Sequence, residues 1–220
     1  GAQGTGVSQE TQLPLHWDRT NNVRWKAPLP EPGNSTPVIW GGRVFVTQAV
    51  DQEQRRSLLC FDRAGGKLLW HQDVAWAGED PTHGTNPHCS ASPVTDGERV
   101  IVSHGSAGLV CYDFEGKELW RRDLGTQRHI WGYGSSPVIQ GGLCYHNFGP
   151  GERTFLIAVD KRTGQTAWQV EDPGGHSGEK KPGEESAPWI GSWSTPVLIQ
   201  SGGSEELVLS WPNRVVAFDP

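Results

Sequence analysis

The stretch AVDKRTGQTAW at residues 158–168 decides the fold, because degenerate copies of it recur along the chain. Earlier copies read CFDRAGGKLLW at 60–70 and CYDFEGKELW at 111–120, and a fourth begins with AFDP at 217–220. The copies follow one another at a period of roughly 50 residues, which indicates a repeat architecture.

Two further elements recur in phase with this motif. A Ser/Thr-rich segment that ends in Pro-Val lies at 35–39, 91–95, 135–139 and 194–198, and a short apolar run lies at 44–46, 100–102, 143–145 and 207–209. Each unit therefore holds four short β-type runs, and no helical periodicity is present. Four strands in a unit of this length are typical of a β-propeller blade.

We therefore predict an all-β chain, a quinoprotein-like β-propeller of four-stranded antiparallel blades. Residues 1–220 form a single domain of about four blades, with repeats at roughly 22–72, 91–122, 135–170 and 194–220. Trp25 matches the closing Trp of a repeat, so residues 22–26 are predicted to be a fourth strand. That strand could complete the last blade and close a ring of four. We favour the alternative, a part of a seven- or eight-bladed ring, because the last motif stops midway.

The repeat explains most of the distinctive residues as architecture. Each motif Asp can accept backbone N–H bonds in the turn after its strand, Gly164 supplies a positive φ, and each closing Trp is a plate between blades. The residues assigned to these structural roles are Trp25, Asp62, Trp70, Asp113, Trp120, Asp160, Gly164, Trp168 and Asp219. Cys60 and Cys111 share a slot with Ala158 and Ala217, so they are interpreted as small buried residues.

Composition excludes several classes of protein. The chain has 29 Gly and 16 Pro, which punctuate many short elements, and its net charge of −6 does not favour nucleic acid. No apolar run is long enough for a membrane span, and no signal peptide is visible. The four cysteines show neither a CxxC spacing nor a disulfide framework.

The motif at 158–168 and its copies resemble the pyrroloquinoline-quinone-like (PQQ-like) repeat. That repeat builds the propellers of quinoprotein alcohol dehydrogenases and of the periplasmic lipoprotein of the outer-membrane β-barrel assembly machine. The segments GNSTP at 33–37 and GSWSTP at 191–196 are similar to those of exported propeller proteins. The resemblance implies the fold and a location in the periplasm or at the cell surface.

Chemistry is expected in the loops that lead into the first strand of each blade, because those strands line the channel and loops carry function. These loops span 28–34, 76–90, 125–134 and 171–193. The candidate ligand-binding residues are Asn34, His83, His88, His129, Trp131, Tyr133, Trp189 and Trp193, with His176 in the last loop. Such a lining would suit a sugar, a flat cofactor or a peptide. The alternative is that the Trp residues plug the channel and the histidines are solvated.

Three functions remain open at this point. The first, which we favour, is a non-catalytic exported scaffold or binding module with a protein or glycan partner and no cofactor. The second is a quinone (PQQ)-dependent alcohol dehydrogenase; its family signature includes adjacent cysteines, calcium ligands and a catalytic Asp, and no two cysteines are adjacent here. The third is a sensor domain of a larger protein. No catalytic residue and no metal site are assigned, because His83 and His88 lack a third strong ligand at suitable spacing.

Overall fold

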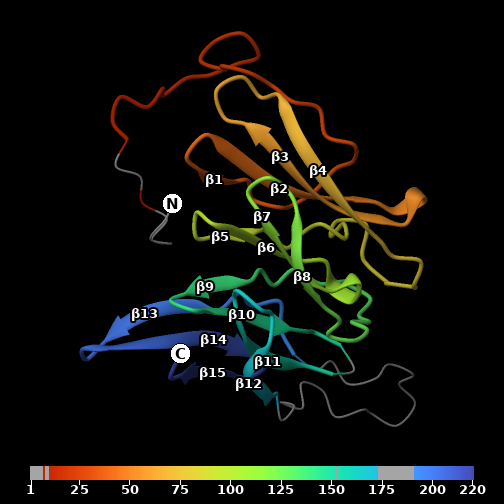
Figure 1. Ribbon diagram of the computed structural model, residues 1–220, viewed down its shortest axis with the longest axis vertical. Helices are drawn as coiled ribbons and strands as arrows, with labels where there is room; N and C mark the ends of the chain where they lie inside the picture. The colour runs from red at the N-terminus through yellow and green to blue at the C-terminus, as the bar shows by residue number, and fades with distance from the viewer. Residues whose placement is uncertain (1–6, 8–9, 152, 173–190) are drawn as a thin grey trace.

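The computed structural model describes residues 7, 10–151, 153–172 and 191–220, and these form four antiparallel sheets in chain order (Figure 1). The first sheet holds β1 (Val38–Trp40), β2 (Arg43–Val50), β3 (Arg55–Asp62) and β4 (Leu68–Ala75). The second holds β5 (Val94–Thr95), β6 (Arg99–Ser103), β7 (Leu109–Asp113) and β8 (Glu118–Arg122). The third holds β9 (Val138–Gln140), β10 (Leu143–Phe148), β11 (Phe155–Asp160) and β12 (Thr166–Glu171). The last holds β13 (Val197–Ser201), β14 (Ser204–Trp211) and β15 (Arg214–Phe218).

The predicted fold class is confirmed by this topology. Strands that are consecutive in the chain are neighbours in each sheet, and the first strands β1, β5 and β9 contact one another from sheet to sheet. The first strand is therefore the inner edge of each blade. Each first strand begins directly after the Pro of the Ser/Thr-rich segment, where a missing N–H breaks no ladder bond.

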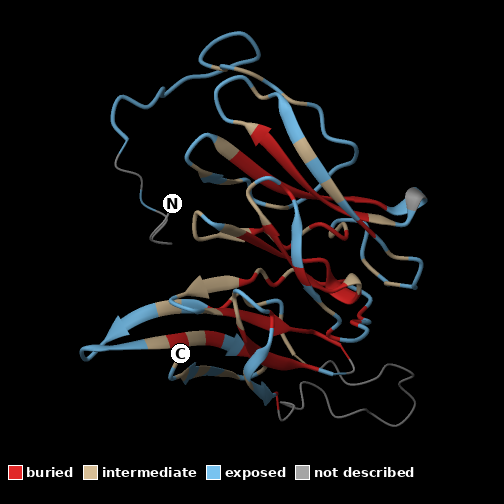
Figure 2. Cartoon of the chain, viewed as in Figure 1, coloured by how far each residue is buried: buried red, intermediate tan, exposed pale blue. Residues whose placement is uncertain are grey.

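The core lies between successive blades and is built from their middle strands, which Figure 2 shows as the most buried parts of the sheets. Between the first and second sheets, Phe45 and Leu58 pack against Val100, Val102 and Tyr112. Between the second and third sheets an equivalent cluster forms around Ile101, Leu109, Phe148 and Ile157.

The closing residues Trp70 and Trp120 each dock on the turn of the following blade. The indole N–H of Trp70 donates to the Phe114 carbonyl at 2.9 Å, and that of Trp120 donates to the Lys161 carbonyl at 3.0 Å. A Cβ on Gly164 would lie 2.8 Å from the Trp120 ring, and the φ of Gly164 is +71°. Glycine at this position thus satisfies both the turn and the approach of the indole.

The motif aspartates act within the same turns. The Asp160 carboxylate accepts the backbone N–H groups of Arg162 at 2.9 Å and Thr163 at 2.8 Å, and these bonds lower its pKa. Asp113 accepts from the N–H groups of Glu115 and Lys117 in the same way. These carboxylates are therefore bonded to backbone N–H groups in the turns between the third and fourth strands of their blades.

Residues 22–26 differ from the prediction. The structure assigns no strand there, and among the described residues no strand pairs with the outer side of β15. The Trp25 side chain nevertheless acts as a closing Trp, because its indole N–H donates to the Arg63 carbonyl at 2.8 Å and its ring lies on Gly66. Through Trp25 the segment packs on the first sheet, and it does not complete the last sheet.

The slot two positions before each motif Asp is a packing position. Cys60 and Cys111 are fully buried and lie directly opposite the closing residues Trp70 and Trp120 across the β3–β4 and β7–β8 ladders. Ala158 lies opposite Trp168 in the same manner. All four cysteines are buried thiols without a disulfide. Within the described residues no helix has the length and apolar character to cross a bilayer.

Candidate functional site

Two ends of the blades differ in what they carry. The turns between third and fourth strands lie at one end, which we call the repeat end. The loops that enter β1, β5, β9 and β13 lie at the opposite end, together with the β2–β3, β6–β7, β10–β11 and β14–β15 turns, because neighbouring strands are antiparallel. We call this the mouth end, and the residues predicted to bind a ligand belong to it.

Two pockets lie at the mouth end, with volumes of about 390 Å³ and about 410 Å³. We call the second of these the tryptophan pocket. It measures ≈ 410 Å³, within the range of small-molecule sites. Its described lining residues are His129, Trp131, Pro150, Gly191, Ser192, Trp193, Ser210, Trp211, Pro212 and Asn213.

Trp131 is presented at the tip of a tight turn. The Gly132 N–H donates to the His129 carbonyl at 2.7 Å, and the φ of Gly132 is +68°. The Asn86 amide donates to the carbonyls of Trp131 and Tyr133 and so holds the turn against the preceding loop. The His83 ring lies 4.4 Å from the Trp131 ring. The backbone of the turn is therefore held in place, and 45% of Trp131 remains exposed.

Trp193 is fixed in a similar way from the next blade. Its indole N–H donates to the Gly132 carbonyl at 2.9 Å, so the two tryptophan loops are bonded to each other. The Asn147 amide donates to the carbonyls of Ser192 and Ser194, each at 3.0 Å, and holds the segment on both sides of Trp193. The residue remains 42% exposed.

Trp211 forms a buried wall of the pocket. Its indole N–H donates to the Asn147 side-chain oxygen at 3.2 Å, and the Arg214 guanidinium lies 5.3 Å from its ring centre. Arg214 also pairs with Asp172, whose side chain is buried. Trp211 is therefore rigid, and Arg214 is engaged outside the pocket.

His129 contributes an uncharged imidazole. Its ring meets the edge of Trp193 at a centroid distance of 4.9 Å, and its Nδ1 accepts the Trp131 N–H at 3.1 Å. Burial lowers its pKa to about 4, because the charged form would lose its hydration. The ring is therefore neutral at physiological pH.

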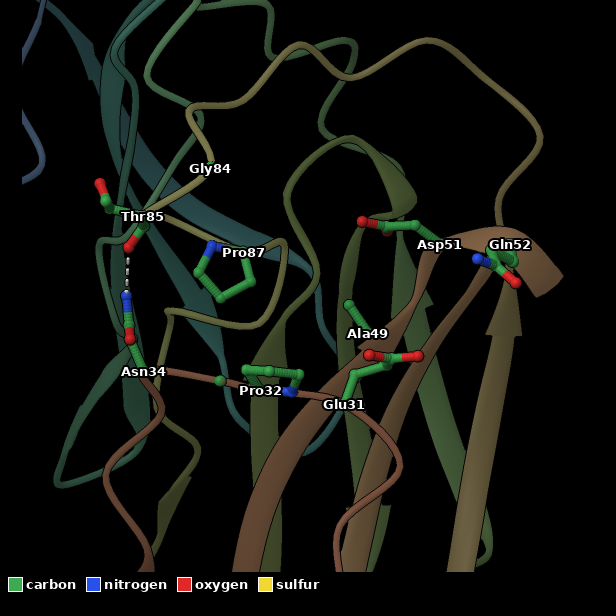
Figure 3. Close-up of a pocket in the computed structure, with 10 residues that line it drawn as sticks. Glu31, Pro32, Asn34, Ala49, Asp51, Gln52, Gly84, Thr85 and Pro87 are labelled. Atoms are coloured by element: carbon green, nitrogen blue, oxygen red, sulfur yellow. Dashed lines mark hydrogen bonds between the residues drawn. The ribbon is translucent and has the colours of Figure 1, made fainter.

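The other pocket lies at the first blade, and we call it the first-blade pocket (Figure 3). Asn34 lies on one side, where its amide donates to the Thr85 carbonyl at 3.0 Å, and Asp51 and Gln52 lie at the end of the β2–β3 hairpin. Glu31 adds a second carboxylate to the lining. This pocket is polar and acidic, whereas the tryptophan pocket is aromatic.

Two predicted site residues are structural. His88 is buried, with its Nδ1 2.9 Å from Asp51 and its Nε2 2.7 Å from the Asp80 carbonyl. The Tyr133 hydroxyl donates to the His88 carbonyl at 2.7 Å, and burial raises the Tyr133 pKa. Arg56 pairs with the same Asp51 at 2.7 Å. These groups join the loop before β5 to the first blade, and of them only Asp51 is in the described lining of the first-blade pocket.

The structure thus brings His129, Trp131 and Trp193 together, with His83 behind Trp131, and places Asn34 in the other pocket. Trp189 and His176 lie outside the described residues. Sequence reasoning missed Trp211, Pro212 and Asn213. Their signal was the turn after the apolar run at 207–209, which an antiparallel blade brings to the same end as the entry loops.

No metal centre is assembled by the described residues, where no group of three or more His, Cys, Asp or Glu side chains is placed to hold an ion. His83 Nδ1 contacts the Thr85 hydroxyl at 2.8 Å, and both nitrogens of His88 are engaged by oxygen atoms. The two histidines therefore serve different neighbours.

Comparison with solved structures shows the same architecture. BamB from Moraxella catarrhalis matches with a TM-score of 0.56 and 15% identity, over 89% of this chain and 49% of that one. Quinohemoprotein alcohol dehydrogenase from Comamonas testosteroni matches with a TM-score of 0.59 and 16% identity, over 86% of this chain and 33% of that one. The chain thus spans about half the length of the first and a third of the second.

Comparison of sequences identifies the family. No curated protein matches the chain significantly. The family model described as outer membrane protein assembly factor BamB matches residues 6–75 and 54–220 in two overlapping segments. Together these segments cover nearly all of the blades, and the chain therefore belongs to the BamB-type family of PQQ-like β-propeller repeat proteins.

Proposed function

We propose that the chain is a non-catalytic β-propeller module that is exported to the cell envelope and binds a partner through its mouth end. The observation that carries this proposal is the pair Trp131 and Trp193, which are 45% and 42% exposed and line one pocket on loops that hydrogen bonds hold in place. Aromatic side chains that stay exposed in the folded protein are typical of binding surfaces.

Preorganisation supports the same interpretation. Asn86 and Asn147 each donate two hydrogen bonds that hold the tryptophan-bearing segments. A binding group that is already ordered loses little conformational entropy when a ligand arrives, so more of the contact energy appears as affinity. The mouth end is built for presentation of these rings.

Family membership favours binding and an envelope location. The matching family is named for an outer membrane protein assembly factor, a role that depends on contacts with other molecules. The quinohemoprotein dehydrogenases share the fold at low identity, and a fold shared at that level does not transfer an activity.

The described lining of the tryptophan pocket is a poor match for the quinone cofactor. Pyrroloquinoline quinone is a polycarboxylate and needs cationic partners, whereas the described lining of the tryptophan pocket contains no Lys or Arg. The cysteines are buried at separate positions, and Asp113 and Asp160 are bonded to backbone N–H groups at the repeat end. We therefore derive no oxidation step for this chain.

The test combines binding with turnover. Intrinsic fluorescence of the protein is titrated with two probe sets, neutral oligosaccharides and an extended peptide of alternating apolar residues. We expect saturable binding of one set that is lost when Trp131→Ala and Trp193→Ala are combined. In parallel, the protein is supplied with pyrroloquinoline quinone, Ca²⁺, an alcohol and an artificial electron acceptor, and we expect no turnover. Quinone-dependent turnover, or binding that the double variant leaves unchanged, would overturn the proposal.

A further inference from the structure

We infer that the tryptophan pocket binds a neutral oligosaccharide, with sugar rings stacked on Trp131 and Trp193. This inference rests on the proposed function, because it specifies the ligand of the same mouth end. It is carried by the charge, the shape and the hydrogen-bonding groups of the pocket.

Charge is the first argument. Among the described residues that line the tryptophan pocket there is no Asp, Glu, Lys or Arg. The guanidinium of Arg214, which follows the lining residue Asn213, pairs with Asp172 and lies over Trp211. By contrast, Glu31 and Asp51 line the first-blade pocket at the same end. The described lining therefore offers a charged ligand no counter-charge, which favours an uncharged one.

The flat rings are the second argument. Pyranose rings present a face of C–H groups, which packs on the electron-rich face of an indole. The Trp193 indole is held by its bond to the Gly132 carbonyl, and the Trp131 ring lies tilted against the His83 ring at a centroid distance of 4.4 Å. Both indoles therefore offer flat rings on loops that are already ordered. Trp211, the last residue of β14 in the last sheet, adds a buried wall.

Polar groups at the rim complete a sugar site. Ser210 and Asn213 are exposed and line the pocket, so they offer a hydroxyl and an amide to ligand hydroxyl groups. The His129 imidazole is also in the lining. A few placed polar groups beside aromatic plates are sufficient to orient a polyhydroxylated ligand.

The strands around the pocket disfavour an extended peptide. β14, which ends at Trp211, lies between β13 and β15, so both of its edges are already paired. Pro150 and Pro212 occupy the adjoining turns and have no N–H to donate. A peptide that adds to a sheet edge would therefore find no free ladder on β14, the strand that ends in the pocket.

The experiment is a titration with soluble hexasaccharides of glucose, xylose and N-acetylglucosamine, followed by intrinsic fluorescence and calorimetry. We expect at least one to bind saturably, with an affinity that falls on the order of tenfold or more in Trp131→Ala and in Trp193→Ala. Trp131→Phe should retain part of the affinity, because a smaller plate remains. Trp17→Ala is the matched control, since Trp17 is 69% exposed at a distant position and its loss should leave the affinity unchanged.

The outcomes separate this inference from the proposed function. If an extended peptide binds and loses affinity in Trp131→Ala while no neutral hexasaccharide binds, the inference is overturned and the binding module stands. Tighter binding of a polygalacturonate hexamer than of any neutral hexasaccharide would also overturn it. If every probe is indifferent to both Trp131→Ala and Trp193→Ala, the inference and the proposed function fail together.

Discussion

The repeat end and the mouth end of the blades use the same residue type for opposite purposes. At the repeat end, Trp70 and Trp120 each donate to a backbone carbonyl of the next blade and cover a glycine. At the mouth end, Trp131 and Trp193 are also held by hydrogen bonds and ring contacts, yet close to half of each remains exposed. Tryptophans that recur with the repeat thus belong to the architecture, whereas those in irregular loops stay exposed and available to a ligand.

The largest expected effect is on Trp120. Trp120→Ala removes a buried indole from between two blades and leaves a cavity against Gly164, so the free energy of unfolding should fall by about 3–5 kcal/mol. Urea denaturation followed by circular dichroism measures the change. Trp120→Phe should recover part of the loss; a variant as stable as the wild type would show that the repeat end does not hold the blades together.

A smaller effect is expected from the buried histidines His104 and His146. Burial lowers their pKa values to about 3 and about 4, so both rings are neutral in the folded protein. Below about pH 6.5 the unfolded chain binds protons on these rings and the folded chain does not, so stability is present above that pH and is lost as pH falls toward 4. Each ring should contribute about 2 kcal/mol of this loss at pH 5.

The measurement is the free energy of unfolding in urea between pH 7 and pH 5. His146→Gln cannot be protonated in this range, so its stability should fall less steeply than that of the wild type. His71→Gln is the control, because His71 is partly exposed and faces Asp73 at the surface. Equal slopes for the wild type and His146→Gln would contradict the assignment.

A further stability effect concerns two glycines in one blade. Gly164 and Gly141 both have positive φ values, +71° and +56°, but only Gly164 lies under an indole. Ala at either position should cost about 1–2 kcal/mol in backbone strain, and Gly164→Ala should cost roughly 1–2 kcal/mol more because its Cβ would meet Trp120. Thermal unfolding of the two variants compares them directly, and equal losses would remove Trp120 from the explanation.

The fold could be predicted from the sequence because each position of the repeat has a local physical role. Asp160 accepts a backbone N–H in the turn, Gly164 supplies the positive φ, and Trp168 lies opposite the buried Ala158. Residues with these roles recur in phase along the chain. Trp25 shows the limit. Its sequence context matches a fourth strand, but a strand also needs a neighbour to pair with, and sequence similarity does not supply one.

The site could be predicted only in part. His129, Trp131 and Trp193 were accessible to prediction because they lie in irregular loops before first strands. His88 is instead bonded to Asp51, which is far away in the chain and lies in the hairpin of the first blade. Trp211 joins the pocket because an antiparallel blade returns its second strand to the mouth end. Both facts depend on contacts between distant segments, which local patterns do not encode.

The most direct test of the difference between the two ends is the free energy of unfolding of Trp131→Ala and of Trp193→Ala, each compared with Trp120→Ala in urea. If the mouth end presents these rings for binding, each variant should unfold cooperatively and lose no more than about 1 kcal/mol, since surface changes rarely lose more. A loss as large as that of Trp120→Ala would contradict the account, because the mouth tryptophans would then be needed to hold the blades together.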